Sequence, residues 1–298
     1  QYIIGFYYNR DSAIDSPDDE KAFYWLRLAA EQGHCEAQYS LGQKYTEDKS
    51  RHKDNGQAIF WLKKAALQGH TFASNALGWT LDRGEDPNYK EAVAWYQIAA
   101  ESGMSYAQNN LGWMYRNGNG VAQDYTLAFF WYKQAALQGH SDAQNNLADL
   151  YEDGKGVAQN ETLAAFWYLK SAQQGNRHAQ FQIAWDYNAG EGVDQDYKQA
   201  MYWYLKAAAQ GSVGAYVNIG YMYKHGQGVE KDYQAAFEWF TKAAECNDAT
   251  AWYNLAIMYH YGEGRPVDLR QALDLYRKVQ ASGTRDVSQE IREIEDLL

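Results

Sequence analysis

The sequence predicts an all-α solenoid of about seven to eight helix-pair repeats of 36 residues, ended by a C-terminal capping helix. Three observations predict this class. Tryptophans recur at a nearly constant interval, and a glycine follows most of them at a fixed distance. The 298-residue chain also has 26 tyrosines but only three prolines, with few β-branched runs to support strands.

The tryptophan series defines the repeat. The intervals are 36, 34, 36, 36, 36 and 36 residues along Trp25, Trp61, Trp95, Trp131, Trp167, Trp203 and Trp239. Leu275 continues the series after another 36 residues, and a glycine stands eight residues after six of the seven tryptophans. The register therefore holds along the chain with a single deletion of two residues.

The first helix of each repeat carries the pattern A-x-x-x-L-G-x-x-Y, as in Ala107, Leu111, Gly112 and Tyr115. These positions fall at i, i+4, i+5 and i+8, on one face of a helix with 3.6 residues per turn. We expect the leucine and tyrosine to be buried. The glycine, or alanine in its place, lets a neighbouring helix approach closely.

The connection to the second helix carries G-x-G-V in four repeats, as in Gly118, Gly120 and Val121. The first glycine is expected to end the helix in the left-handed region, and the valine to pack back on the core. An Asp or Asn stands seven residues before each tryptophan or its leucine substitute, where a side-chain oxygen can cap the second helix. These predicted caps are Asp18, Asp54, Asn88, Asp124, Asn160, Asp196, Asp232 and Asp268.

The second helix carries A-x-x-W-Y-x-x-A-A, as in Ala128, Trp131, Tyr132, Ala135 and Ala136. Its wide apolar band is typical of a helix packed between two neighbours, and we assign Trp131 to the core. The residue before the tryptophan is expected to pack between repeats, because an exposed apolar stripe of that length would favour association. This position holds Tyr24, Phe60, Ala94, Phe130, Phe166, Tyr202 and Glu238.

The repeat boundaries divide residues 1–298, which we predict to form a single solenoid. Residues 1–21 match the end of a truncated repeat and a connection, because Ile4, Gly5 and Tyr8 align with later first helices, so we expect more sequence upstream. Residues 22–283 hold the repeat units. Residues 284–298 are richly charged, and the spacing of Ile291, Ile294 and Leu298 predicts one apolar stripe on a capping helix.

The full unit, L-G-x-x-Y-x-x-G-x-G-V-x-x-D-Y-x-x-A-x-x-W-Y-x-x-A-A-x-x-G, is seen almost completely in residues 111–139. It resembles the Sel-one-like repeat (SLR) family, a relative of tetratricopeptide repeats. The resemblance implies a right-handed α/α superhelix whose first helices line a concave surface. It also implies protein–protein interaction, often in bacteria, where some members neutralise toxic effector enzymes. A cysteine-rich branch is linked to penicillin binding, but Cys35 and Cys246 are too few and too far apart for that branch.

Several other function classes are not expected. The formal net charge of −11 would repel a phosphate backbone, so nucleic acid is not a predicted partner. No apolar run is long enough to cross a bilayer, so no membrane insertion is expected. The sequence does not decide between an exported or periplasmic and a cytoplasmic location, and the oligomeric state is not predicted.

The sequence predicts no catalytic residue, metal site or cofactor, and we do not expect an enzyme. Neither H-E-x-x-H nor C-x-x-C occurs, and the G-x-G motifs follow helices instead of strands, which argues against a dinucleotide site. His34, His70 and His140 share the position after the turn glycine. That shared place in the repeat predicts a structural role for them.

A partner surface is predicted on the first helices, where positions facing away from the leucine hold amides and aromatics. An Asn can pair with a peptide backbone, and a Trp offers a large rigid contact area. Arg116 and Lys224 could meet acidic groups. The predicted partner-binding residues are Asn75, Trp79, Asn109, Asn110, Trp113, Arg116, Asn145, Asn146, Trp185, Asn218, Tyr221, Lys224 and Asn254.

Two interpretations of these positions stay open. The asparagines could bind a partner or bond to neighbouring helices, and the tryptophan rings could pack between repeats. For Trp113 and Trp185 we favour the partner surface, because Asp149 takes the same position in the repeat between them. The predicted function is a non-enzymatic scaffold that binds a protein or peptide segment. The alternatives are an immunity or inhibitor protein against a bacterial effector and, with least support, a hydrolase-like enzyme.

Overall fold

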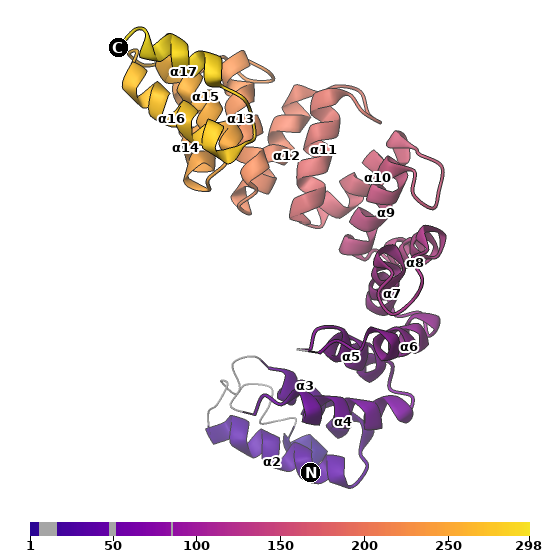
Figure 1. The fold of residues 1–298 in the computed structure, drawn as a ribbon. Helices are drawn as coiled ribbons and strands as arrows, with labels where there is room; N and C mark the ends of the chain where they lie inside the picture. The colour runs from indigo at the N-terminus through magenta and orange to yellow at the C-terminus, as the bar shows by residue number, and fades with distance from the viewer. Residues whose placement is uncertain (6–16, 48–51, 85) are drawn as a thin grey trace. The chain divides into compact units, whose positions relative to one another are not determined.

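The computed structural model describes residues 1–5, 17–47, 52–84 and 86–298, and the side chains of residues 17 and 18 lie outside this description. Within these ranges every regular element is a helix, so the predicted all-α class is confirmed (Figure 1). The helices form two compact units, Gln1–Gln159 and Asn160–Leu298, which we call unit 1 and unit 2 and describe separately. The predicted helix fragment around Ile4 to Tyr8 lies mostly outside the described residues.

The predicted first and second helices alternate along both units. The first helices are α3 (Cys35–Thr46), α5 (Thr71–Asp82), α7 (Ser105–Asn117), α9 (Ser141–Asp153), α11 (Arg177–Ala189), α13 (Val213–His225) and α15 (Ala249–Tyr261). The second helices are α2 (Pro17–Glu31), α4 (Asn55–Leu67), α6 (Tyr89–Glu101), α8 (Tyr125–Leu137), α10 (Glu161–Gln173), α12 (Tyr197–Ala209), α14 (Tyr233–Glu245) and α16 (Leu269–Ser282). A shorter helix, α17 (Ser288–Glu295), follows them.

Second helices pack between two first helices, as the wide apolar band predicts. In unit 1, α4 packs against α3 of its own repeat and α5 of the next, and α6 packs likewise against α5 and α7 (Figure 1). In unit 2, α12 packs between α11 and α13. The repeat therefore forms a solenoid in which each second helix bridges consecutive repeats within a unit.

Side chains cap the second helices at the predicted positions. Asp124 Oδ1 accepts hydrogen bonds from the backbone N–H groups of Thr126 and Leu127, at 2.8 and 2.9 Å. The same kind of bond is made by Asp54, Asn88, Asn160, Asp196, Asp232 and Asp268. Seven of the eight predicted caps are confirmed, and the side chain of Asp18 lies outside the description.

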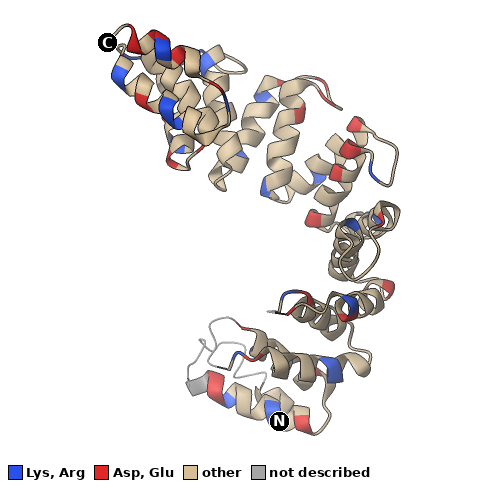
Figure 2. Ribbon diagram, in the orientation of Figure 1, with Lys and Arg blue, Asp and Glu red and all other residues tan. Residues whose placement is uncertain are grey.

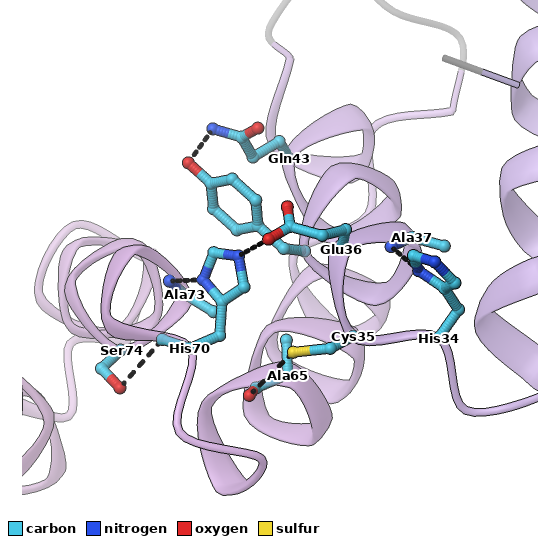
Figure 3. Close-up of polar contacts among 10 residues, drawn as sticks. His34, Cys35, Glu36, Ala37, Gln43, Ala65, His70, Ala73 and Ser74 are labelled. Carbon is cyan, nitrogen blue, oxygen red and sulfur yellow. Dashed lines mark hydrogen bonds and ion pairs between the residues drawn. The ribbon is translucent and has the colours of Figure 1, made fainter. Parts of the chain in front are cut away.

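Histidines cap three of the first helices. His34, His70 and His140 precede α3, α5 and α9, and each Nδ1 accepts from the backbone N–H three residues later, at 3.1 to 3.3 Å. Figure 3 shows the His70 ring between Ala73, at the start of α5, and Glu36 of the preceding repeat, whose Oε1 lies 3.1 Å from His70 Nε2. The predicted structural role of these histidines is confirmed.

The G-x-G-V connection holds its shape through backbone conformations that favour glycine. Gly118 ends α7 at a φ of 71°, as predicted. Gly120 has a φ of 73°, and a Cβ built on it would lie 2.4 Å from the carbonyl oxygen of Tyr89. This second glycine therefore lets the loop pass directly over the start of α6, and Val121 packs on the core as expected.

The deepest core position differs from our expectation. Trp131 is only half-buried, whereas Tyr132 beside it is fully buried. Gly112 explains the difference, because a Cβ there would lie 2.7 Å from the Tyr132 ring, so the ring fills the space above the glycine. The assignment of Trp131 to the buried core was wrong, and the residue after each tryptophan takes that place.

The residue before the tryptophan is exposed, contrary to our expectation that it packs between repeats. Phe60, Phe130, Phe166 and Tyr202 keep 46 to 49% of their surface exposed, and Tyr24 keeps 57%. Each ring makes a T-shaped contact with the ring of the following tryptophan. The second helices therefore carry an outward aromatic position.

Buried glutamines link consecutive helices, which the motif analysis did not anticipate. Gln108 Nε2 donates to the carbonyl of Ala100 at the end of α6, and Gln138 Nε2 donates to Gln108 Oε1, at 3.2 and 2.8 Å. The same pair of bonds joins Gln38 to Gln68 and Gln180 to Gln210. These amides give a second hydrogen bond to carbonyls at the helix ends, which also accept from the N–H of the turn glycine: Gly33, Gly103 or Gly175.

Helix α17 packs its apolar side on the end of unit 2. Ile294 and Val287 are fully buried in the cluster around Tyr276, and Ile291 packs against it. The predicted stripe is wrong in one member, because α17 ends at Glu295 and Leu298 lies beyond it with 62% of its surface exposed.

Candidate partner-binding surface

The asparagines of unit 1 form a ladder across successive first helices. Asn110 Nδ2 on α7 donates to Asn75 Oδ1 on α5, at 3.2 Å. Asn146 Nδ2 on α9 donates to Asn109 Oδ1 on α7, at 3.0 Å. Part of the structural interpretation therefore holds, since these amides do bond to neighbouring helices.

The ladder leaves some hydrogen-bonding groups of its side-chain amides unused. Each amide has a carbonyl oxygen and an NH₂ group, and the ladder uses only one of the two. In the described part of the chain, Asn109 Nδ2 and Asn110 Oδ1 have no partner, and both side chains are half-buried. Adjacent residues of α7 thus present one donor and one acceptor. Asn145, next to Asn146, is instead buried.

A surface cavity lies directly beside these two amides. It has a volume of about 350 Å³ and is lined by Asp82, Arg83, Asn109, Asn110 and Trp113. Trp113 keeps 44% of its surface exposed. The cavity therefore combines an exposed aromatic ring with the unused donor and acceptor of the ladder.

Asp82 and Arg83 supply the charge of this cavity. Tyr96 donates its hydroxyl hydrogen to Asp82 Oδ2 at 2.8 Å, and Arg83 Nε lies 3.6 Å from Asp82 Oδ1. Burial raises the pKa of the Asp82 carboxyl, against the opposite effects of Tyr96 and Arg83. The Arg83 guanidinium is exposed and lies 5.2 Å from the ring of Trp79. Sequence reasoning missed Arg83, although its place four residues after Trp79 is the signal.

A second cavity, of about 250 Å³, lies between α3 and α5 and contains two more of the predicted residues, Asn75 and Trp79. Its lining also includes Phe72, which is 58% exposed. On α7, Tyr106 takes the equivalent place and is 63% exposed. Phe72 and Tyr106 stand seven residues before Trp79 and Trp113, about two helical turns away on the same face. That spacing is the sequence signal for both missed residues.

The two predicted cations are engaged within the chain. Arg116 Nη1 lies 3.0 Å from Asp149 Oδ2 on the next first helix. Lys224 Nζ lies 2.8 Å from Glu263 Oε2, and its side chain is only 10% exposed. Both cations therefore balance acidic groups of their own unit.

Unit 2 contains exposed aromatics without the ladder. Trp185 and Tyr221 keep 42% and 46% of their surfaces exposed, similar to Trp113. Asn218 and Asn254 donate instead to the carbonyls of Gly214 and Thr250, four residues earlier in their own helices. The structure thus brings aromatics, amides and a cavity together in unit 1.

The comparison with family models assigns the whole repeat series. The Sel1 repeat model matches residues 1–34, 35–70, 71–104, 105–140, 141–176, 177–212, 213–248 and 249–278. The chain belongs to the Sel1-repeat family. Sel1-repeat proteins are typically protein-interaction scaffolds and generally non-catalytic.

Relatives support this assignment. The Sel1-repeat-containing protein YbeQ of Escherichia coli K12 is 97% identical over 124 residues, which is 42% of this chain and 38% of YbeQ. A protective antigen of uropathogenic E. coli strains, with an SLR fold, has a TM-score of 0.88 and 36% identity over 95% of this chain and 61% of its own. A Sel1 repeat protein from Oxalobacter formigenes has a TM-score of 0.73 and 29% identity over 98% of this chain and 86% of its own. The chain thus spans less than two thirds of the first two relatives.

Two further observations concern membrane insertion and the distribution of charge. No helix in the ranges that the structure describes is both long and apolar enough to cross a membrane. Lys and Arg residues alternate with Asp and Glu residues along the ribbon of both units (Figure 2).

Proposed function

We propose that this Sel1-repeat chain is a scaffold that binds an extended segment of a protein partner on the first-helix face of unit 1. The observation that carries the proposal is the unused donor of Asn109 beside the unused acceptor of Asn110, next to Trp113. A peptide unit of an extended segment offers a C=O and an N–H, which complement that pair whatever the side chains are.

The neighbouring side chains add apolar contact to these backbone bonds. Trp113 lies at the 350 Å³ cavity and Trp79 at the 250 Å³ cavity. Tryptophans at such positions supply much of the free energy of binding at protein interfaces. The ladder bonds hold the amides in place before the partner arrives, which lowers the entropic cost of binding.

Substitutions at Asn109 and Trp113 distinguish the ladder bond from the outward NH₂ donor of Asn109 and from the aromatic surface. Asn109→Asp keeps an oxygen to accept the bond from Asn146 but replaces the outward NH₂ group by a carboxylate oxygen. Trp113→Ala removes the aromatic surface. Partners captured from the native host with the wild-type chain are identified by mass spectrometry, and the dissociation constant of the purified complex is measured by calorimetry.

We expect Trp113→Ala to cost about 2 kcal/mol of binding free energy, roughly a thirtyfold rise in Kd. Asn109→Asp should also weaken binding while leaving the thermal midpoint nearly unchanged. Trp185→Ala is the matched control, since that ring has the same repeat position and similar exposure but no ladder beside it. Equal losses for Trp113→Ala and Trp185→Ala, or none for either, would contradict a site in unit 1. The narrower role of an inhibitor of a bacterial effector stays a prediction.

A further inference from the structure

The guanidinium of Arg83 lines the 350 Å³ cavity beside the ladder with most of its hydrogen-bond donors unused. Its side chain is 66% exposed, and its Nε lies 3.6 Å from Asp82 Oδ1. Nη1 and Nη2 carry the remaining N–H donors of the guanidinium. In the part of the chain that the structure describes, no group accepts from these two nitrogens. Arg83 therefore offers the Nη edge of its guanidinium to a ligand.

Two contacts hold the guanidinium in place without using this edge. Nε faces Asp82, whose other carboxylate oxygen accepts from the Tyr96 hydroxyl at 2.8 Å. Cζ lies 5.2 Å from the centre of the Trp79 ring, and a planar guanidinium interacts favourably with an aromatic face. These contacts restrict the side chain before a partner arrives, which lowers the entropic cost of binding.

The repeat does not require an arginine at this position. Arg83 stands six residues after Leu77, at the C-terminal end of α5, where a cation interacts favourably with the helix dipole. The same place in the other first helices holds Glu47, Asn117, Asp153, Ala189, His225 and Tyr261. Since acids also occur there, the fold does not select a cation, and the charge of Arg83 is available for binding.

Unused donors exceed unused acceptors in this cavity. The Nη groups of Arg83 and the NH₂ group of Asn109 can donate, whereas the ladder pair leaves only Asn110 Oδ1 to accept. Both oxygens of Asp82 already face donors. A peptide unit on the two asparagines uses one donor and one acceptor, and the Nη edge of Arg83 remains. A carboxylate complements that edge, because its two oxygens can accept two parallel hydrogen bonds from a guanidinium.

We infer that the partner segment carries an Asp or Glu side chain that binds Arg83, next to the peptide unit held by Asn109 and Asn110. This inference rests on the proposed function and names the residue class that the site selects. The ladder continues from α7 to α5 on one side and to α9 on the other. A segment along it passes through the site, so the carboxylate belongs to a side chain instead of a chain end. Each residue of an extended segment advances roughly 3.3 Å, which places the acid within about two residues of the bound peptide unit.

Random short peptides displayed on phage are the probe for this preference. They are selected on the wild-type chain and counter-selected on the Trp113→Ala chain, so that the peptides kept depend on the proposed site. We expect Asp or Glu to predominate at one aligned position of these peptides. Replacing that residue by Asn or Gln in a synthetic peptide should raise the dissociation constant, measured by calorimetry, about tenfold.

Charge reversal at Arg83 is the decisive test. Arg83→Glu should weaken binding of the acidic peptide at least about tenfold, and a peptide with Lys in place of the acid should recover most of this loss. A purely structural defect at the end of α5 would not be restored by a change in the peptide. Arg270→Glu is the matched control, because it makes the same change of charge at an exposed position of unit 2. It should leave the dissociation constants of both peptides unchanged.

Two results would overturn this inference and leave the proposed function standing. One is a set of Trp113-dependent peptides without an acidic preference, and the other is an acidic peptide that Arg83→Glu binds as tightly as the wild type does. The absence of any Trp113-dependent peptide would overturn the proposed function as well. Circular dichroism verifies the fold of Arg83→Glu. Arg83→Gln, which removes the charge without adding an acid, should show a smaller loss in the same direction.

Discussion

At the residue scale, depth in the core depends on what lies opposite each side chain. Trp131 and Tyr132 share the apolar band of α8, yet only Tyr132 is fully buried. The missing side chain of Gly112 makes room for the tyrosine ring, and a Cβ there would lie 2.7 Å from it. The spacing of the tryptophans identifies the repeat but not its most deeply buried residue.

This difference in depth predicts different costs of truncation. Tyr132→Ala should lower the free energy of unfolding by about 3–5 kcal/mol, because a large buried ring leaves a cavity that its neighbours fill only in part. Trp131→Ala should cost roughly half as much, since part of its ring already faces water. Urea denaturation followed by circular dichroism measures both. An equal or larger loss for Trp131→Ala would show that the tryptophan dominates the core.

At the element scale, helix ends are set by bonds that each repeat renews. Gly120 and Gly139 both have positive φ, at 73° and 88°. A Cβ on Gly120 would lie 2.4 Å from the Tyr89 carbonyl oxygen, whereas a Cβ on Gly139 would meet nothing within 4 Å. Comparing the two glycines therefore distinguishes the cost of the left-handed backbone conformation, which both share, from the cost of a steric clash, which only Gly120 would have.

Gly139→Ala should cost about 1 kcal/mol of stability, the strain of an alanine in the left-handed region. Gly120→Ala should cost clearly more, about 3 kcal/mol, because the loop must also move away from α6. The thermal midpoints of the two variants are measured side by side. Identical shifts would mean that the loop moves without cost and that the clash is not real.

The cap of α9 makes stability depend on pH. His140 Nδ1 accepts from the Ala143 N–H at 3.3 Å, the Tyr106 ring lies edge-on above it, and Asp142 lies in the first turn. Burial lowers the pKa of His140, although Asp142 acts to raise it. A lowered pKa means that the unfolded chain binds the proton more readily. Stability from this group is thus complete above the unfolded pKa of about 6.5 and is lost as the pH falls below it.

His140→Asn tests this dependence, because Asn176 caps α11 at the equivalent position, accepting from Ala179 at 3.0 Å. At pH 7.5 the variant should match the wild type within a few tenths of a kcal/mol. At pH 5 it should be more stable by about 1 kcal/mol, the typical value of an N-cap, since protonated Nδ1 cannot accept. Urea midpoints across this pH range measure the difference in stability between the variant and the wild type. A difference that is the same at every pH would show that protonation of His140 does not cause the pH dependence.

At the scale of the whole molecule, the repeat made most of the fold predictable. The caps at Asp54 and Asp124, the left-handed glycines and the alternation of helices all follow from bonds between residues close in sequence. Membership of the Sel1-repeat family follows from the same motifs, since its model matches eight segments of the chain.

The candidate surface was only partly predictable, because its chemistry depends on partners one repeat away. Trp79 and Trp113 are exposed beside cavities, as a partner surface requires, but their role stays a prediction. The bond between Asn146 and Asn109 spans 37 residues, and that between Arg116 and Asp149 spans 33. No local pattern distinguishes an amide that bonds across repeats from one that bonds to its own helix, as Asn254 does.

The sequence by itself determined the period, the helix pairs, the caps and the family, because these depend on hydrogen bonds and backbone conformations within a few residues. Only the tertiary structure decided which polar groups remain free and which rings face water. Asn109 and Asn110 keep one donor and one acceptor because adjacent first helices use the other halves of their amides. Phe130 faces water to the same extent as Phe60, Phe166 and Tyr202, with 46 to 49% of each surface exposed, although Gln134 replaces the lysine that α4, α10 and α12 place near the ring. Both outcomes depend on how side chains meet in space, which local sequence does not specify.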